Sequence, residues 1–228
     1  MLNNNFEGEI IFLSDNWHNY LDVNDYKDRP INYLEIGIYY GANFLSVGNS
    51  YASHSESRLY GIDPWENYDD YSFNYDDGEQ ESIYNTFLRN VENSGIKEKI
   101  TIHRGYSHRE ILNFPDSFFD IIYLDGNFKS EYILEDAVLS FRKLKKNGIM
   151  ICDYYARTDL TDNSDKGING FMSGYYKNIK FLGVNYYHQL FIQKITPNER
   201  TYIEEDNEEI DDEQDQQQVQ EQDNSEIV

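Results

Sequence analysis

An apolar segment that runs directly into a glycine-spaced turn constrains the fold of this chain most strongly. Tyr33 to Ile36 reads as a short buried strand, and Gly37 and Gly41 bracket the turn that follows it. The next apolar segment, Leu59 to Ile62, ends in an acid, Asp63. In an open parallel sheet, ligands bind beyond the carboxyl ends of the strands, near the point where the strand order reverses. The pattern therefore predicts a βαβ unit whose turn and acid form a ligand site.

The same turn narrows the choice of ligand. Glycines at 37 and 41 let backbone approach a ligand, and Asp63 can accept hydrogen bonds from both hydroxyls of a ribose. We therefore expect an adenosine-bearing cofactor. A dinucleotide fingerprint needs a glycine where Tyr39 stands, because that glycine admits a pyrophosphate. This disfavours a nucleotide-dependent oxidoreductase. The alternative to a cofactor site is a glycine turn that closes the βαβ unit and binds no ligand.

Strand and helix patterns alternate along the chain, which is typical of a mostly parallel sheet covered by helices on both faces. Strands are predicted at 32–37, 58–63, 99–103, 119–124 and 148–152, and helices near 17–21, 42–52, 80–93, 108–113, 130–146 and 164–177. Phe181–Val184 and Gln189–Ile192 read as two further strands that form a C-terminal antiparallel hairpin. The predicted fold class is a Rossmann-like α/β three-layer sandwich.

Two helix boundaries carry sequence signals of their own. Ser107 to Glu110 has the form of a capping box, so a helix is expected to begin there. The helix from Ser130 has lysines at 143, 145 and 146, which complement its dipole, and Gly148 is expected to close it.

Composition excludes several classes of partner. The net charge is −23, and the last 25 residues hold 12 acids and no Lys or Arg, so about half of the charge lies there. Nucleic acid and membrane surfaces are disfavoured because both attract clustered Lys and Arg. No apolar run reaches the ~20 residues of a membrane helix, and no basic segment precedes Ile10–Leu13 as in a secretory signal. With Cys152 as the single cysteine, a cytoplasmic protein is expected.

The chain divides into two predicted parts. Residues 1–203 are expected to form one domain, and residues 204–228 an acidic, Gln-rich, disordered tail. Within the domain, the acidic and tyrosine-rich connection 66–81 is interpreted as a lid, with a merely solvated loop as the alternative. The sequence leaves the oligomeric state open, a homodimer included.

The second half of the domain carries a family resemblance. Phe119-Asp120-Ile121-Ile122-Tyr123-Leu124-Asp125-Gly126-Asn127 and Asn147-Gly148-Ile149-Met150-Ile151-Cys152-Asp153-Tyr154-Tyr155 resemble paired motifs of class I S-adenosylmethionine (SAM)-dependent methyltransferases. The similar group is the catechol-O-methyltransferase-like small-molecule enzymes (methyltransferase family 24 type). The glycine-spaced turn Glu35-x-Gly37-x-x-x-Gly41 resembles their first motif.

This resemblance implies a set of site residues. Glu35, Gly37 and Gly41 would line the methionine part of SAM, Tyr39 is assigned to the cofactor without a specified part, and Asp63 would bind the ribose hydroxyls. Pro64, Trp65, Tyr106 and Ser107 would lie beside the adenosine, and Asp125 is assigned to the cofactor as well. The alternatives are that Trp65 is a core anchor and that Ser107 is only a helix cap.

The catalytic residues depart from those of the relatives. Phe128 stands where many relatives have a histidine, and Tyr154 where they have a second acid. Asp125, Lys129 and Asp153 are the candidates for catalysis, and Asp125 with Asp153 for Mg²⁺. The interpretation is an O-methyltransferase that acts on a small hydroxylated acceptor, such as a sugar or a phenol. A SAM-binding protein that has lost turnover is the alternative.

Overall fold

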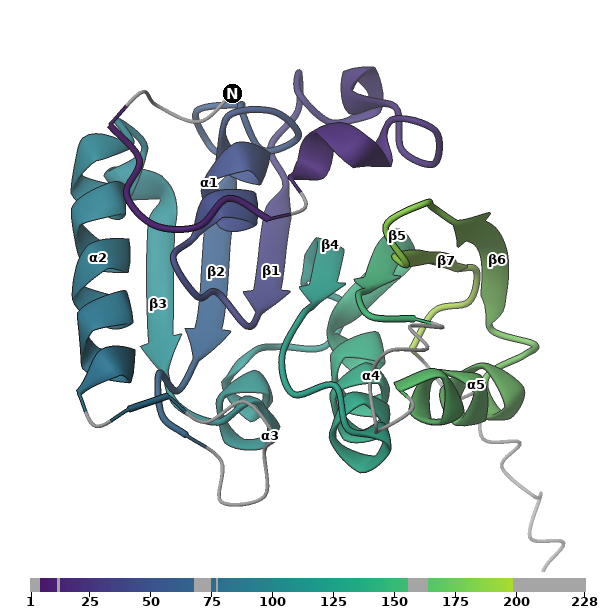
Figure 1. The fold of residues 1–228 in the computed structure, drawn as a ribbon. Helices are drawn as coiled ribbons and strands as arrows, with labels where there is room; N and C mark the ends of the chain where they lie inside the picture. The colour runs from purple at the N-terminus through teal and green to yellow at the C-terminus, as the bar shows by residue number, and fades with distance from the viewer. Residues whose placement is uncertain (1–4, 12, 68–74, 77, 156–163, 199–228) are drawn as a thin grey trace, which may run out of the picture. The chain divides into compact units, whose positions relative to one another are not determined.

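A seven-stranded sheet organises the computed structural model, which describes residues 5–11, 13–67, 75–76, 78–155 and 164–198 (Figure 1). The strands are β1 Asn32–Ile36, β2 Arg58–Asp63, β3 Ile100–Arg104, β4 Phe119–Leu124, β5 Leu144–Cys152, β6 Ile179–Val184 and β7 Leu190–Lys194. Their order is β3-β2-β1-β4-β5-β7-β6. The first five pair in parallel, whereas β7 is antiparallel to both β5 and β6. All seven predicted strands are present.

Helices cover both faces of this sheet. The helices are α1 Ala42–Gly48, α2 Glu79–Asn93, α3 Ser107–Glu110, α4 Ser130–Lys143 and α5 Ser164–Gly174, with 3-10 turns η1 Ser14–Trp17, η2 Val23–Asp25, η3 Lys97–Lys99 and η4 Ile111–Asn113. One hydrophobic cluster joins the sheet to η1, α1 and α2, and a second joins it to η4, α4 and α5. This arrangement confirms the predicted three-layer α/β sandwich.

The central strand β4 shows why its sequence is apolar throughout. Ile121 and Tyr123 belong to the first cluster, and Ile122 and Leu124 to the second. Successive side chains of a strand point to opposite faces, so a strand buried on both faces needs an unbroken apolar run. The strand order reverses between β1 and β4, which opens a crevice at their carboxyl ends.

The end of α4 differs from the prediction. The helix stops at Lys143, and the buried Leu144 already begins β5, so Gly148 lies within the strand. Lys194 of β7 explains the early stop, because its Nζ donates to the carbonyls of Phe141 at 2.7 Å and Leu144 at 2.8 Å. These are carbonyls that a longer helix would have bonded internally.

The helix expected near 17–21 is instead the 3-10 turn η1, which ends at the buried Trp17. The tail 204–228 and the middle of the connection 66–81 lie outside the described residues, so both interpretations stay predictions. In the described part of the chain, no helix is both long enough and apolar enough to cross a membrane.

Candidate functional site

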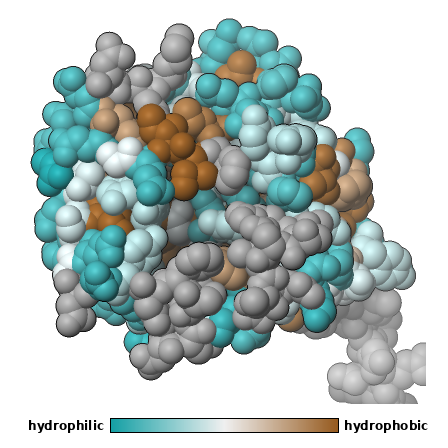
Figure 2. All heavy atoms as spheres, in the orientation of Figure 1, coloured by the Kyte–Doolittle hydropathy of each residue, from teal (hydrophilic) through white to brown (hydrophobic). Residues whose placement is uncertain are grey.

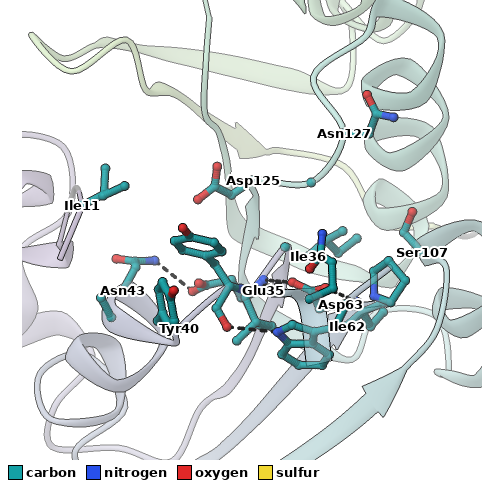
Figure 3. A pocket seen from close by; sticks show the side chains of 18 of the residues that line it. Ile11, Glu35, Ile36, Tyr40, Asn43, Ile62, Asp63, Ser107, Asp125 and Asn127 are labelled. Atoms are coloured by element: carbon teal, nitrogen blue, oxygen red, sulfur yellow. Dashed lines mark hydrogen bonds between the residues drawn. The ribbon is translucent and has the colours of Figure 1, made fainter. Parts of the chain in front are cut away.

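A cavity of about 270 Å³ lies at the carboxyl ends of β1, β2 and β4. Eight of the predicted site residues line it: Glu35, Gly37, Tyr39, Asp63, Pro64, Trp65, Ser107 and Asp125. The other four, which the structure also describes, do not: Gly41, Tyr106, Lys129 and Asp153. Asp63 and Ser107 lie at one end of the cavity, Ile11 and Asn43 lie at the other, and Asp125 lies between them (Figure 3).

The charge of this cavity is one-sided. Five acids line it: Glu9, Glu35, Asp63, Glu66 and Asp125. Among the described lining residues there is no Lys or Arg. A concave site with charge of one sign concentrates ligands of the opposite sign, so this one favours a cation.

The glycine turn is shaped by the chain itself. Gly37 has a φ of +85°, and a Cβ there would lie 2.1 Å from the carbonyl oxygen of Asp125. Gly41 has a φ of +86°, and its Cβ would lie 2.7 Å from the ring of Phe87. Both positions therefore require glycine for packing as well as for backbone conformation. Gly41 does not line the cavity and a Cβ there would face Phe87, so the structure gives no support to the expected ligand contact at this position.

Asp63 ties the turn to the end of β2. Its carboxylate accepts backbone N–H bonds from Ile38 at 2.7 Å, Tyr39 at 3.0 Å and Trp65 at 2.7 Å. Burial raises the pKa of Asp63, although these three hydrogen bonds act to lower it. Tyr39 and Trp65 both have positive φ, which non-glycine residues rarely adopt, so Asp63 holds two strained positions in place.

Trp65 is mainly a core residue. Its indole is 2% exposed and stacks on Phe87 with ring centroids 5.2 Å apart. The Nε1 atom donates to the carbonyl of Tyr39 at 3.1 Å. The anchor alternative thus accounts for most of this side chain, even though part of it lines the cavity.

The predicted capping box is not formed. Tyr106 is the N-cap residue of α3, and the hydroxyl of Ser107 bonds the buried Asp136 of α4 instead of capping the helix. Glu110 bonds His103 at 3.2 Å rather than reaching back to the cap. Tyr106 does not line the cavity itself, but its hydroxyl donates to Glu66, which does, at 3.1 Å. Of this pair, only Ser107 lines the site.

Glu35 is a buried carboxyl with two side-chain partners. The hydroxyl of Tyr33 donates to it, and the Nδ2 of Asn43 donates at 2.9 Å (Figure 3). Burial raises the pKa of Glu35 to about 8, against the opposing effect of these two hydrogen bonds. Glu35 therefore changes its charge near neutral pH.

Asp125 lies at the end of β4 beside two aromatic residues. Burial, together with the nearby Asp153 and Glu35, raises the pKa of Asp125 well above its usual range. The side chain of Tyr154 hydrogen-bonds Asp125, and its ring packs 5.3 Å from the buried ring of Phe128. The two residues that replace polar groups of the relatives thus form one aromatic wall next to Asp125.

Comparison with known proteins now identifies the family. A family profile described as "Methyltransferase domain" matches residues 34–155, which is more than half of the chain. The chain belongs to this methyltransferase family. No curated protein matches its sequence.

Solved structures share the fold at low sequence identity. A putative rRNA-methylase from Clostridium thermocellum superposes with a TM-score of 0.59 at 11% identity, covering 83% of this chain and 99% of that one. The O-methyltransferase TomG from Streptomyces achromogenes, in complex with SAM, gives 0.54 at 18% over 72% and 73%. A putative caffeoyl-CoA O-methyltransferase from Staphylococcus aureus gives 0.52 at 17% over 73% and 76%. These likenesses show the class I methyltransferase fold.

The two carboxylates predicted to bind Mg²⁺, Asp125 and Asp153, do not form a suitable ligand pair in this methyltransferase. Asp153 is 2% exposed, and its carboxylate accepts bonds from the hydroxyl of Tyr123, from Gln189 at 3.2 Å and from the N–H of Tyr154 at 2.6 Å. Within the described residues, no group of three or more His, Cys, Asp or Glu is placed to hold a metal ion. Asp153 is committed to a buried network below the cavity, so the pair with Asp125 does not fit Mg²⁺, which needs accessible oxygen ligands.

Lys129 does not line the cavity. It is the N-cap residue of α4, and its backbone N–H donates to the Oδ1 of Asn127 at 3.1 Å. The structure therefore gives no support to Lys129 as a catalytic residue.

Several lining residues were not among those predicted from the sequence, and four of them bear on the chemistry of the site. Glu9 and Ile11 come from the N-terminal segment, which no motif covers. Asn43 is 6% exposed with an Oδ1 that has no hydrogen-bond partner, and Asn127 is 4% exposed with an Nδ2 that has none. A polar group buried without a partner costs free energy, which a bound ligand can recover. The sequence did carry one signal for the two asparagines: Asn43 stands two residues after the glycine turn, and Asn127 two residues after Asp125.

The flanks of the connection 66–81 also reach the cavity. Glu66, Tyr75 and Gln80 line it. Asn67 and Tyr75 bond each other, through the Asn67 amide to the Tyr75 carbonyl at 2.8 Å and the Tyr75 N–H to the Asn67 Oδ1 at 3.1 Å. The base of this connection is thus closed beside the site.

Proposed function

We propose that this methyltransferase uses SAM to methylate a hydroxyl oxygen of a small-molecule acceptor. The observation that carries the proposal is the cavity with five lining acids and, among its described residues, no Lys or Arg. SAM brings a sulfonium and an ammonium group against a single carboxylate, so its net positive charge matches this lining. A dinucleotide brings phosphates, which such a lining repels.

The predicted cofactor residues keep their roles in this proposal where they reach the cavity. Asp63 would receive the ribose hydroxyls, and Glu35 and Gly37 would lie beside the methionine part. Pro64 and Ser107 would lie beside the adenosine. When bound, SAM supplies a methyl group on sulfur that an oxygen nucleophile can displace in line.

Asp125 would handle the proton of the acceptor. Burial and the nearby Asp153 and Glu35 raise its pKa, which makes this carboxylate a stronger base than an exposed one. As the bond from the acceptor oxygen to the methyl group forms, the hydroxyl proton would pass to the Asp125 carboxylate and then to solvent. The hydrogen bond with Tyr154 would hold the carboxylate in place. Lys129 and Asp153, which do not line the cavity, have no part in this step.

One observation favours a second candidate, a SAM-binding protein without turnover. Phe128 is 3% exposed and packs on Tyr154, so this position provides no imidazole base. If Asp125 does not suffice as the base, the site would bind the cofactor and stop there.

Two measurements on the full chain separate these outcomes. Calorimetry with SAM tests binding, and mass spectrometry of mixtures with phenols, sugars and amino alcohols tests methyl transfer. Binding with transfer that Asp125→Asn abolishes is the expected result. Binding without transfer to any acceptor supports the second candidate, and absence of binding refutes both.

A further inference from the structure

The N-terminal segment is anchored next to the cavity by residues far away in sequence. The backbone N–H of Glu7 donates to the Oδ1 of Asn90 at 2.8 Å, and the Nδ2 of Asn90 donates to the Glu7 carbonyl at 2.8 Å. The same Nδ2 donates to the Tyr40 carbonyl at 3.0 Å. Arg89 bonds the Glu7 carboxylate at 2.9 Å and 3.1 Å. One buried asparagine of α2 therefore joins the segment to the turn after β1.

Close packing adds to these bonds. Gly8 has a φ of +98°, and a Cβ there would lie 2.5 Å from the Cγ of Tyr40. The backbone thus lies directly against the Tyr40 ring, which itself lines the cavity. Because residues 7 and 8 are held on both sides, the residues that follow them have a defined place on the cavity wall.

Those residues combine apolar surface with a negative charge. Glu9 and Ile11 line the cavity, whereas Ile10 and Ile11 are 58% and 47% exposed. Figure 2 shows an apolar patch where the segment crosses the molecule in Figure 1. When a ligand covers a half-exposed isoleucine on a cavity wall, apolar surface leaves water and the complex is stabilised.

A buried acceptor atom lies on the same side of the cavity. The Nδ2 of Asn43 is committed to Glu35 and to the Tyr33 hydroxyl at 3.2 Å, which orients the amide. Its Oδ1, buried and without a partner, lies on the side away from Glu35 (Figure 3). Carboxylates and an amide oxygen accept hydrogen bonds but donate none, so a ligand group here must be a donor.

We infer that Glu9 and Ile11 form an acceptor subsite that selects a positively charged amine carried on an apolar body. This inference rests on the proposed function and specifies its substrate class. Ile11 covers the apolar body, and Glu9 attracts the protonated amine at the rim. The hydroxyl to be methylated then points inward to Asp125, which lies between this end of the cavity and Asp63 (Figure 3). Anionic acceptors are rejected by the same charges.

Calorimetry on the full chain saturated with S-adenosylhomocysteine, the demethylated product, tests this subsite with three phenols. Tyramine, tyrosol and 4-hydroxyphenylacetate share a ring and carry charges of about +1, 0 and −1 at neutral pH. Tyramine is expected to bind at least tenfold more tightly than 4-hydroxyphenylacetate, with tyrosol between them. Glu9→Gln should reduce this preference to threefold or less, and Ile11→Ala should weaken all three by about threefold.

A matched variant controls for net charge. Glu56→Gln removes one exposed carboxylate that does not line the cavity, and it should leave the tyramine preference unchanged. Equal affinity for the three phenols, no binding of tyramine, or a preference that survives Glu9→Gln overturns the subsite. These outcomes leave the proposed function standing when S-adenosylhomocysteine binds. Failure of S-adenosylhomocysteine itself to bind overturns both.

Discussion

Buried carboxyls lie at both ends of the parallel strands, and they differ in whether the chain provides cations to pair with them. Asp120, at the start of β4, accepts bonds from Lys145 at 2.7 Å, Arg29 at 2.9 Å and the N–H of Asn32 at 3.0 Å. Burial acts to raise the pKa of Asp120, but these partners lower it overall. At the other end, Glu35 and Asp125 have raised pKa values and no cation beside them in the described lining.

The contrast separates a stabilising carboxyl from a binding one. A buried carboxylate is costly unless it is paired, so a chain that needs Asp120 only for its fold supplies the cations itself. Where the chain leaves the cations out, the free energy of pairing remains available to a ligand. The difference is therefore itself an argument that the cavity binds a cation.

The largest effect is expected for Asp63→Ala. This change removes the proposed ribose partner and the acceptor of three backbone N–H bonds, so affinity for SAM should fall by about 100-fold, or about 2.7 kcal/mol. Titration calorimetry measures it. An affinity within threefold of the wild type would show that Asp63 only shapes the turn.

Asp120→Ala should lower stability without affecting the cavity. It leaves Lys145 and Arg29 without their carboxylate partner, and their side chains are 40% and 49% exposed. Because water solvates both cations in part, the free energy of unfolding should fall by about 2 kcal/mol, less than for a fully buried pair. Urea unfolding measures this loss. Affinity for SAM in the folded variant should stay the same, and a tenfold loss would contradict the division between the two ends.

The affinity for SAM should depend on pH, because Glu35 in the cavity changes its charge near neutral pH. Burial raises the pKa of Glu35 to about 8, so this carboxyl is mostly protonated at pH 6.5 and becomes anionic as the pH rises through 8. A cation binds the anionic form better, hence SAM affinity should rise about tenfold from pH 6.5 to 8.

The same shift has an opposite sign for the stability of the ligand-free protein. Because the folded pKa of Glu35 lies above its unfolded value, its contribution is fully present below about pH 4.5 and is lost as pH rises through 8. Glu35→Gln should flatten both curves, and calorimetry and urea unfolding at each pH test this. A variant that keeps the rise in affinity would assign it to another group.

The smallest effect is expected for Lys129→Met. Lys129 does not line the cavity, so methyl transfer to whichever acceptor is found should stay within twofold of the wild type. Steady-state kinetics measure kcat and KM. A tenfold fall in kcat with KM unchanged would show that Lys129 takes part in the reaction.

Much of this molecule follows from local sequence signals. Continuous apolar runs such as Phe119–Leu124 mark strands buried on both faces, and Gly37 and Asp63 mark the ends where a ligand site forms. The parallel sheet and the placement of Glu35 and Asp63 at its carboxyl end follow from these signals, whereas Asp125 was expected there from the family resemblance.

Other features depend on contacts that no local pattern encodes. The end of α4 is decided by Lys194, about 50 residues away along the chain, and the N-terminal wall of the cavity by Asn90, which is 83 residues from Glu7. Asp153 has the sequence context of a site residue, yet Tyr123 and Gln189 draw its carboxylate into a buried network. Hydrogen-bond partners of a buried group are chosen by packing in three dimensions. Local signals therefore account for the sheet and its crevice, whereas long-range contacts select the carboxyls that face the ligand.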